Sequence, residues 1–513
     1  MKNILLEDVI KAVNGVILQN INTNDIYIKN ISTDTRSISQ DSLFIPIVGE
    51  NFDAHDFIKD AFKLGAVCCL SEKDINNNNN NNNLIIIKVK STREALKDLA
   101  RYYISLFENL KVVALTGSAG KTTTKDMIAS CLSQKYKVVK TQGNFNNEIG
   151  LPLTIFNIDD TTEIAVLEMG MNHSGEISEL SKIAQPDVAL ITNIGYAHIE
   201  NFDSIDGIFR AKYEIFDYMN PNSNILKILN ADDDILATLQ DIQDNQDNQD
   251  VQDNQDKTNN IYEFYGLSDS NYINNLKAFA SHVQENGIDG ITAKINYYNN
   301  INSLVSFDIN LKYAGKHILS NTLPAVIVSD FFSLSPLEIK NGLLEFKPSK
   351  MRMDIVKPLS ASYNIINDTY NANPTSMRAT LDVLATCNTR KVAILGDMYE
   401  LGDYTDKFHK EIGAYAINKS IDELIFIGEH SKKMLDGARD TLSKSPSSNS
   451  VSINYFKTQD DFINNLNNKD FVKQIIKQGD TILVKASRGM KLEKTVNILL
   501  EDNFNTRYLN NEF

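Results

Sequence analysis

The chain has 513 residues and a formal net charge of −15 at pH 7. This length predicts about three domains, each large enough for its own core. The acidic balance argues against a general nucleic-acid surface, so an anionic substrate would have to be bound by local lysines and arginines. The four cysteines do not form a disulfide framework and fit a reducing cytosol; they are Cys68, Cys69, Cys131 and Cys387.

The sequence argues against a signal peptide and a membrane span, and it contains two low-complexity tracts. Acidic residues follow Met1 too soon for a signal peptide, and no run of about 18 apolar residues is present. We therefore expect a cytoplasmic protein without membrane insertion. The asparagine run at 76–83 and the Asp-Asn-Gln tract at 244–256 cannot bury apolar surface, so both are expected to be solvated loops. A metal or aggregation role for the second tract is the minor alternative.

Residues 1–88 alternate short strands and helices. Asp34 and Arg36 follow an expected strand at 26–31, and His55 lies in a later turn. Polar groups at strand ends can contact a ligand, but ordinary surface turns give the same pattern. The residues alone leave both interpretations open.

The most informative motif follows an expected helix at 92–110. An apolar run from Val112 to Leu115 is typical of a buried parallel strand, and a glycine loop, Lys121, Thr122 and a helical pattern come next. In such a phosphate cradle, backbone N–H groups and the helix N-terminus face the anion. The lysine reaches the outer phosphates, and the threonine hydroxyl can bind Mg²⁺. Leu115 stands where the common loop has glycine, so this is a shortened variant. A plain glycine turn is the alternative, and we interpret the motif as an ATP site.

Two features after this loop are candidates for contact with a ligand. The segment 141–152 holds several amide side chains between two glycines, which suggests hydrogen bonds to a ligand, although asparagine is abundant throughout the chain. Glu168 ends a buried strand expected from Ile164. Ligands of open α/β sheets gather beyond the carboxyl ends of strands, so Glu168 is placed to hold Mg²⁺ or to orient water.

His198 and Lys212 are harder to interpret. His198 follows the strand expected at 187–193 and could equally ligate a metal or cap a turn. Lys212 lies in a helical pattern and, on pattern alone, is a solvated lysine. Further strands are expected at 225–230, 261–265, 291–298 and 304–312, and a helix is expected to open after Gly315.

A basic, proline-bearing stretch at 346–354 is predicted as a linker. The chain beyond it alternates strands with polar loops and helices, and Pro374 is placed at a helix start. This pattern predicts a second doubly wound sheet. The polar residues at its functional edge are Asp368, Asn371, Asp397, Lys485 and Arg488.

The predicted fold is therefore α/β with three domains. We expect a small α/β N-terminal domain at 1–88 and a central P-loop ATPase-like parallel-sheet domain at 89–347, with a low-complexity insertion near 241–260. A C-terminal Rossmann-like domain is expected at 348–513.

These segments together resemble the Mur ligase family, the ATP-dependent amide ligases that build the peptide of peptidoglycan precursors. The motifs that carry the resemblance are, in chain order, Thr116-Gly-Ser-Ala-Gly-Lys-Thr122, Leu167-Glu-Met-Gly170, Thr192-Asn-Ile-Gly-Tyr-Ala-His198, Ala211-Lys212, and Gly315-Lys-His with Asn321. Three further motifs look more narrowly like those of family members that add D-alanyl-D-alanine: Asp368-Thr-Tyr-Asn-Ala-Asn-Pro-Thr-Ser-Met377, Leu395-Gly-Asp-Met-Tyr-Glu-Leu-Gly402 and Val484-Lys-Ala-Ser-Arg-Gly-Met490. The resemblance covers all three expected domains and fails only in the two low-complexity tracts.

The resemblance implies an enzyme that joins D-alanyl-D-alanine to UDP-N-acetylmuramoyl-tripeptide through an acyl phosphate, forming ADP and phosphate. Because water would hydrolyse an acyl phosphate, we expect the third domain to close on the central one, with a hinge around Ser349. We also expect a monomer. A sister ligase that adds the third amino acid would carry an Asp-Asn-Pro-Arg-like motif where Tyr370-Asn-Ala-Asn-Pro374 stands. A folylpolyglutamate synthase would lack a comparable uridine-binding first domain. A nucleotide-gated switch protein, the alternative from another class, would not need a second metal site.

The resemblance also implies site residues. The catalytic residues would be Lys121, Glu168, His198 and Lys212. Thr122 and Glu168 would bind one Mg²⁺, and His198 and Lys212 a second, with Lys212 carbamylated by CO₂. Residues for the nucleotide would be Gly117, Ser118, Ala119, Gly120, Lys121, Thr122, Thr123, Asn321, Arg352 and Asp368. Residues for the substrates would be Thr35, Arg36, Asp53, His55, Asn147, Asn371, Asn373 and Arg488. Two departures from the family pattern are Pro324, in place of a small helix former, and Met351, in place of a glycine.

Overall fold

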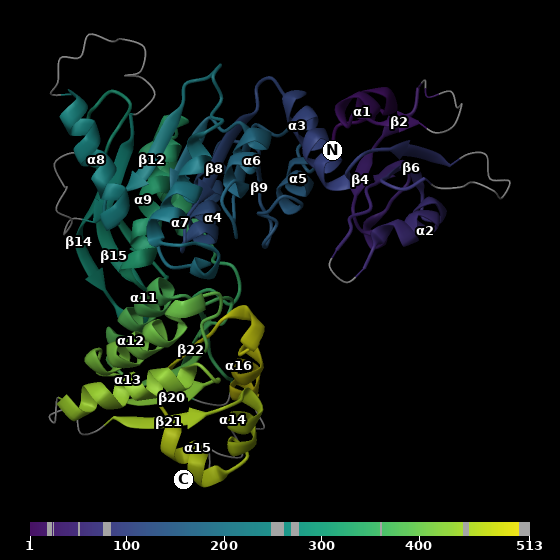
Figure 1. The fold of residues 1–513 in the computed structure, drawn as a ribbon. Helices are drawn as coiled ribbons and strands as arrows, with labels where there is room; N and C mark the ends of the chain where they lie inside the picture. The colour runs from purple at the N-terminus through teal and green to yellow at the C-terminus, as the bar shows by residue number, and fades with distance from the viewer. Residues whose placement is uncertain are drawn as a thin grey trace. The chain divides into compact units, whose positions relative to one another are not determined.

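The computed structural model describes residues 1–17, 23, 25–49, 52–74, 84–247, 261–267, 276–359, 362–444 and 451–501. The asparagine run at 76–83 lies outside these ranges. The chain forms two compact units. Figure 1 shows the helices and strands, coloured from purple at the N-terminus to yellow at the C-terminus. The first comprises 1–116, 135–190 and 211–227, and the second comprises 117–134, 191–210 and the chain from 228 onward.

The N-terminal part of the first unit is a small α/β fold. Its elements are β1 (Ile4–Leu5), α1 (Leu6–Ala12), β2 (Val16–Ile17), β3 (Tyr27–Ile28), β4 (Asn30–Ser32), η1 (Thr35–Ser37), β5 (Ser42–Phe44), η2 (Ala54–Phe57), α2 (Ile58–Lys63), β6 (Ala66–Ser71) and β7 (Ile85–Lys88). A five-stranded sheet has the order β2-β7-β6-β5-β4, and β1 pairs with β3. The single strand expected at 26–31 is wrong, because β3 and β4 belong to different sheets.

The rest of the first unit contains the strand that leads into the glycine loop. Its elements are α3 (Thr92–Ser105), β8 (Lys111–Thr116), β9 (Val138–Lys140), α5 (Gly150–Ile155), β10 (Ile164–Glu168), α6 (Glu176–Ala184) and β11 (Val188–Ile191). The strands lie in the order β11-β8-β10-β9, and β10 is parallel to both β8 and β9. The β8 side chains from Val112 to Leu115 are buried, as predicted for a strand covered on both faces. Helix α7 (Ile205–Tyr213) follows in the sequence, and the division between the two units falls within it, after Arg210.

The second unit begins with the helix after the glycine loop. Its next elements are α4 (Lys121–Leu132), η3 (Ile199–Asn201), β12 (Leu226–Asn230), α8 (Asp234–Asp247), β13 (Glu263–Leu267), β14 (Leu276–Glu285), β15 (Ile291–Tyr298), β16 (Leu304–Leu311), α9 (Lys316–Phe331) and α10 (Pro336–Glu345). Strands β12 to β16 pair in sequence order, parallel as far as β14 and antiparallel beyond it. Pro324 lies inside α9.

Two sequence expectations fail here. Helix α8 runs to Asp247, so residues 244–247 of the Asp-Asn-Gln tract are helical and not a loop, while the rest of the tract lies outside the described residues. Strand β14 was not predicted. Two of its inward positions, Ala278 and Ala280, are small, so its alternation is weak.

The C-terminal part of the second unit is a six-stranded sheet with helices. Its elements are β17 (Asp354–Val356), β18 (Asn364–Asp368), α11 (Pro374–Ala385), β19 (Lys391–Gly396), η7 (Gly402–Tyr404), α12 (Thr405–Asn418), β20 (Glu423–Ile427), α13 (Ser431–Lys444), β21 (Ser452–Phe456), α14 (Gln459–Asn465), α15 (Lys469–Ile475), β22 (Thr481–Lys485), η9 (Arg488–Met490) and α16 (Glu493–Leu500). The strand order is β17-β18-β22-β19-β20-β21, and only β17 pairs antiparallel. The predicted α/β class with several parallel-sheet domains is confirmed. No helix within the described ranges is long and apolar enough to cross a membrane.

Candidate nucleotide and metal site

The glycine loop is a tight cradle whose shape requires glycine. Gly117 and Gly120 have φ angles of 154° and 79°. A Cβ on Gly117 would lie 1.9 Å from Thr192 Oγ1, and one on Gly120 would lie 2.7 Å from Asn321 Oδ1. Both glycines therefore combine positive φ with close approach, so any other residue would displace its neighbours. Asn321, expected at the nucleotide, lies against the loop.

Asn193 holds the loop and was missed by sequence reasoning. Its backbone carbonyl accepts from Ser118 N at 3.0 Å, and its Oδ1 accepts from Ala119 N at 2.8 Å. Its Nδ2 donates to Ala119 O at 2.9 Å. The N–H groups of Ser118 and Ala119, expected at the phosphates, are thus used inside the protein. The signal was present, because Asn193 stands just past the carboxyl end of β11.

The first turn of α4 is the better anion site. The N-cap Gly120 supplies no side-chain cap, so an anion can approach the helix N-terminus. Lys121 Nζ donates to Gly117 O at 2.6 Å and so lies across the loop. Thr122 is buried next to it. The cradle thus has the lysine, the helix N-terminus and the hydroxyl that a nucleoside triphosphate requires.

In the first unit, Glu168 and the asparagine-rich loop come together. Glu168 ends β10 and is 2% exposed. Its Oε1 accepts from Asn146 Nδ2 at 2.9 Å. Asn147, expected at the substrate, accepts from Gly150 N at 2.9 Å in the turn that leads into α5. A buried carboxylate at a strand end provides the oxygen ligand that Mg²⁺ prefers.

Lys212 is 2% exposed, so the pattern-based expectation of a solvated lysine is wrong. Ile208, four residues earlier on α7, is also buried and shares its helix face. That spacing was a signal for burial. Buried lysines serve as reactive amines more readily than solvated lysines do.

His198 has a left-handed backbone, with φ 60°, and caps η3. Its Nδ1 lies 2.7 Å from Glu400 Oε2, and this contact holds the pKa of the Glu400 carboxyl below its usual value. Within the described ranges, no three His, Cys, Asp or Glu side chains form a preformed metal cluster. The donors available for Mg²⁺ are single groups: the carboxylate of Glu168, the hydroxyl of Thr122 and the imidazole of His198.

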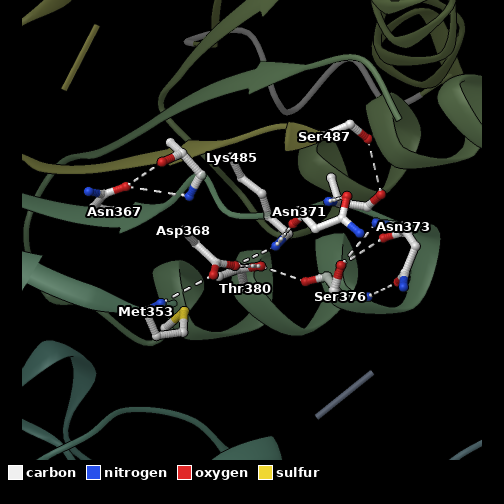
Figure 2. A network of polar contacts seen from close by, with 11 residues as sticks. Met353, Asn367, Asp368, Asn371, Asn373, Ser376, Thr380, Lys485 and Ser487 are labelled. Atoms are coloured by element: carbon white, nitrogen blue, oxygen red, sulfur yellow. Dashed lines mark hydrogen bonds and ion pairs between the residues drawn. The ribbon is translucent and has the colours of Figure 1, made fainter. Parts of the chain in front are cut away.

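The C-terminal sheet carries a buried polar network at its carboxyl edge (Figure 2). Asp368 and Lys485 end the adjacent parallel strands β18 and β22 in register, and they form an ion pair. Lys485 Nζ also donates to Asn371 O at 3.0 Å, and Asp368 Oδ1 accepts from Met353 N at 3.1 Å. Lys485 therefore pairs with Asp368, the residue expected at the nucleotide.

Two other asparagines and an aspartate at this edge have structural contacts. Asn373 Oδ1 caps α11 by accepting from Ser376 N at 2.8 Å, and its Nδ2 donates to Ser118 O of the glycine loop at 3.2 Å. Asn371 Oδ1 accepts from the next backbone N–H. Asp397 is buried and accepts from Ser431 N at 2.7 Å, so it caps α13 and does not line an open edge.

The arginines expected at the ligands pair within the C-terminal part. The Arg352 guanidinium lies over the Tyr370 ring, 3.9 Å from its centroid. Arg488 lies 3.1 Å from Glu493. Both guanidinium groups therefore already have a partner, a ring for Arg352 and a carboxylate for Arg488, which a bound ligand would join or replace.

The N-terminal candidates form two local clusters. Asp34 accepts from Arg36 N at 2.9 Å and Arg36 Nε at 3.0 Å, on either side of Thr35. His55 is buried; its Nδ1 lies 2.6 Å from Asp53 Oδ1, and its Nε2 accepts from Glu72 N at 3.1 Å. Both ring nitrogens of His55 thus bind protein groups, so this histidine shapes the turn.

His317 leads to a prediction about pH. Burial lowers the pKa of this α9 histidine to about 4, although Asp368 opposes the shift. Below about pH 6.5 the unfolded chain therefore binds a proton that the folded chain does not, and stability falls as the pH drops. We expect a loss of about 2 kcal/mol between about pH 7.5 and pH 5 from this residue. Denaturant unfolding at both pH values checks it.

The variant His317→Asn should lose correspondingly less stability over the same interval. The matched control is the same substitution at the exposed His282 on β14. Equal losses in the wild type and His317→Asn would contradict the assignment.

Comparisons with known proteins identify the family. Three family models match: the Mur ligase family catalytic domain at 27–104, the Mur ligase middle domain at 115–329, and the glutamate ligase domain of Mur ligases at 351–488. The UDP-N-acetylmuramoyl-tripeptide–D-alanyl-D-alanine ligase of Bacillus subtilis is 35% identical over 498 residues, which cover 97% of this chain and 98% of the relative. The chain belongs to the Mur ligase family.

Other relatives of this Mur ligase agree. The Escherichia coli enzyme of the same name is 31% identical over 478 residues, covering 93% of this chain and 95% of the relative. A crystal structure of MurF from Acinetobacter baumannii has a TM-score of 0.82 at 29% identity and covers 98% of this chain and 100% of its own. MurF from Thermotoga maritima, solved with ADP, has a TM-score of 0.72 at 26% identity and covers 93% of this chain and 98% of its own. Like its family, this Mur ligase is an ATP-dependent ligase.

Proposed function

We propose that this Mur ligase joins D-alanyl-D-alanine to UDP-N-acetylmuramoyl-tripeptide and so produces the UDP-muramoyl-pentapeptide precursor of peptidoglycan. The observation that carries the proposal is full-length similarity, over 97% of the chain, to a ligase named for this reaction. The glycine cradle before α4 supports the use of ATP. A cytoplasmic monomer with domains at 1–88, 89–347 and 348–513 belongs to the same proposal.

The reaction must overcome the poor reactivity of a carboxylate. ATP phosphorylates the terminal carboxylate of the tripeptide, and the acyl phosphate that results has a good leaving group. The amine of D-alanyl-D-alanine then attacks its carbonyl carbon, and phosphate leaves from a tetrahedral intermediate. Charge neutralisation and positioning, not covalent catalysis, account for most of the rate in phosphoryl transfer.

The chain's own groups divide these tasks. Lys121 and the first turn of α4 bind the phosphates, with Gly117 to Thr123 around them, and Asn321, Arg352 and Asp368 serve the rest of the nucleotide. We assign two Mg²⁺ sites, one to Thr122 and Glu168 and one to His198 and a carbamylated Lys212. The ions would supply charge neutralisation when bound. The donors fit, because oxygen and imidazole groups are present, but Lys212 fits only after CO₂ has turned its amine into a carboxylate.

Substrate contacts complete the proposal. Thr35, Arg36 and the Asp53–His55 turn would contact the UDP-sugar, and Arg488 with the residues around Asn371 would contact the peptide. Asn147 and Asn373 belong to the same proposed set, although Asn147 accepts from Gly150 N and Asn373 caps α11. Because water would hydrolyse an acyl phosphate, closure of the C-terminal domain at the linker around Ser349 would protect it.

The proposal is tested by phosphate release from ATP with Mg²⁺, dropping one component at a time. We expect turnover only when both the UDP-muramoyl tripeptide and D-alanyl-D-alanine are present. Turnover with free amino acids in place of the dipeptide would favour a sister ligase. Hydrolysis of ATP without either substrate would favour a nucleotide-driven switch.

A further inference from the structure

Glu400 is absent from the site assigned above, yet it contacts one of its residues. Its Oε2 lies 2.7 Å from Nδ1 of His198. The side chain of His198 is 24% exposed and that of Glu400 is 48% exposed. Both residues have left-handed backbones, with φ of 60° and 63°, a conformation that is uncommon for residues other than glycine. Two unfavourable conformations thus bring the two side chains together.

The surrounding contacts fix this arrangement. Glu400 O accepts from Glu200 N at 3.4 Å, two residues after the histidine. One residue before Glu400, Tyr399 N donates to Ser487 Oγ at 2.9 Å. Two residues before the histidine, the Tyr196 ring packs on the Phe408 ring, with centroids 4.5 Å apart. The carboxylate is therefore presented by an anchored loop.

The chemistry of metal-bound histidine explains what such a carboxylate does. A neutral imidazole ligates through one nitrogen, and the other carries a proton. A carboxylate that accepts this proton fixes the tautomer, orients the ring and raises the basicity of the ligating nitrogen. In His198 the nitrogen beside Glu400 is Nδ1, in a contact that has the distance but not the direction of a hydrogen bond, and Nε2 lies on the opposite side of the ring for the ion.

We propose that Glu400 is the positioning residue for His198: it holds the Nδ1–H tautomer and aims Nε2 at the divalent cation. The inference rests on the proposed function, which assigns His198 to that cation. His198 belongs to the segment matched by the middle-domain model, and Glu400 belongs to the segment matched by the ligase-domain model. The histidine is therefore fully prepared only when the two segments are in contact, which couples metal affinity to that contact.

The test is Mn²⁺ binding in the presence of ADP, followed by electron paramagnetic resonance on the full-length chain. The variant Glu400→Ala should lower the affinity of the Mn²⁺ site assigned to His198 by about 10- to 100-fold. Glu400→Gln should weaken it less, because an amide oxygen still accepts a hydrogen bond. Glu411→Ala is the matched control: Glu411 lies in the same sheet domain and pairs with Arg378 at 2.8 Å. It should bind Mn²⁺ like the wild type.

A second readout is the tautomer of His198, measured by ¹⁵N NMR on histidine-labelled protein and assigned with His198→Gln. We expect Nδ1–H in the wild type and its loss in Glu400→Ala. Mn²⁺ affinity within about twofold of the wild type in Glu400→Ala, or an Nε2–H tautomer in the wild type, would overturn the inference. If Glu400→Ala does not fold, the wild-type tautomer decides: Nδ1–H supports the inference and Nε2–H overturns it.

The two proposals can fail separately. A wild-type enzyme that ligates both substrates while Glu400→Ala binds Mn²⁺ normally would overturn only the role of Glu400. A wild-type enzyme without ligation would overturn the proposed function, whatever the Mn²⁺ titrations give.

Discussion

Replacing Lys121 with alanine should lower the rate of ADP formation by about a hundred- to a thousandfold, because a fixed cation at the phosphates acts on charge that is redistributed in the transition state. The structure places Nζ across the glycine loop, 2.6 Å from Gly117 O, at the N-terminus of α4. In this tight, partly buried cradle a charge is screened less than it would be in water. The measurement is ADP release under saturating tripeptide and dipeptide.

The control for this prediction is Lys135→Ala. Lys135 is an exposed lysine just beyond the same helix, and its ammonium lies over the Tyr136 ring. This variant should keep wild-type turnover. Because Lys121 also bonds the loop backbone, the thermal transition of Lys121→Ala should be measured as well. A fall in turnover of less than about tenfold with an unchanged transition would remove Lys121 from the phosphate site.

Replacing Lys485 with methionine should lower the free energy of unfolding by about 3 kcal/mol, since it leaves a largely buried carboxylate without its cation. The side chains of Lys485 and Asp368 are 2% and 13% exposed. Asp368 would retain the Met353 N–H at 3.1 Å, which offsets part of the loss. Denaturant unfolding of the full chain, followed by a probe in the C-terminal sheet, measures the effect.

A double-mutant cycle separates the ion pair from side-chain packing. The combination Asp368→Asn with Lys485→Met should be less destabilised than the sum of its single variants, because neither buried charge remains. Lys391→Met on the neighbouring strand β19 is the matched control. Its contact with Asp422 spans 3.9 Å near the surface, and its loss should cost less than about 1 kcal/mol. Additive losses in the cycle would show that the pair is not coupled.

Local signals predicted the parts of the site that depend on one stretch of chain. The apolar run before Gly117 gave the buried strand β8, and Glu168 ends the strand where the pattern placed it. Pro374 begins α11, as its fixed φ favours. Each feature follows from side-chain types within a few residues, so the fold class and the cradle could be predicted from sequence.

Features that depend on distant neighbours could not be predicted in the same way. The ion pair of Asp368 and Lys485 joins residues 117 positions apart, and it exists because β18 and β22 are adjacent in the sheet. The contact of Glu400 with His198 likewise depends on two loops from different segments. Asn193 was visible as a residue past a strand end, but nothing local showed that it would bond the glycine loop. Tertiary neighbours, not local propensity, decide these roles.

The most direct test of the account follows oxygen atoms through the reaction. The tripeptide is labelled with ¹⁸O in its terminal carboxylate and incubated with ATP, Mg²⁺, D-alanyl-D-alanine and enzyme, and the released phosphate and the peptide product are analysed by mass spectrometry. If ATP activates this carboxylate as an acyl phosphate, each phosphate released carries one labelled oxygen and the new amide keeps the other. Pentapeptide formed with unlabelled phosphate, or phosphate released without any pentapeptide, would contradict the account.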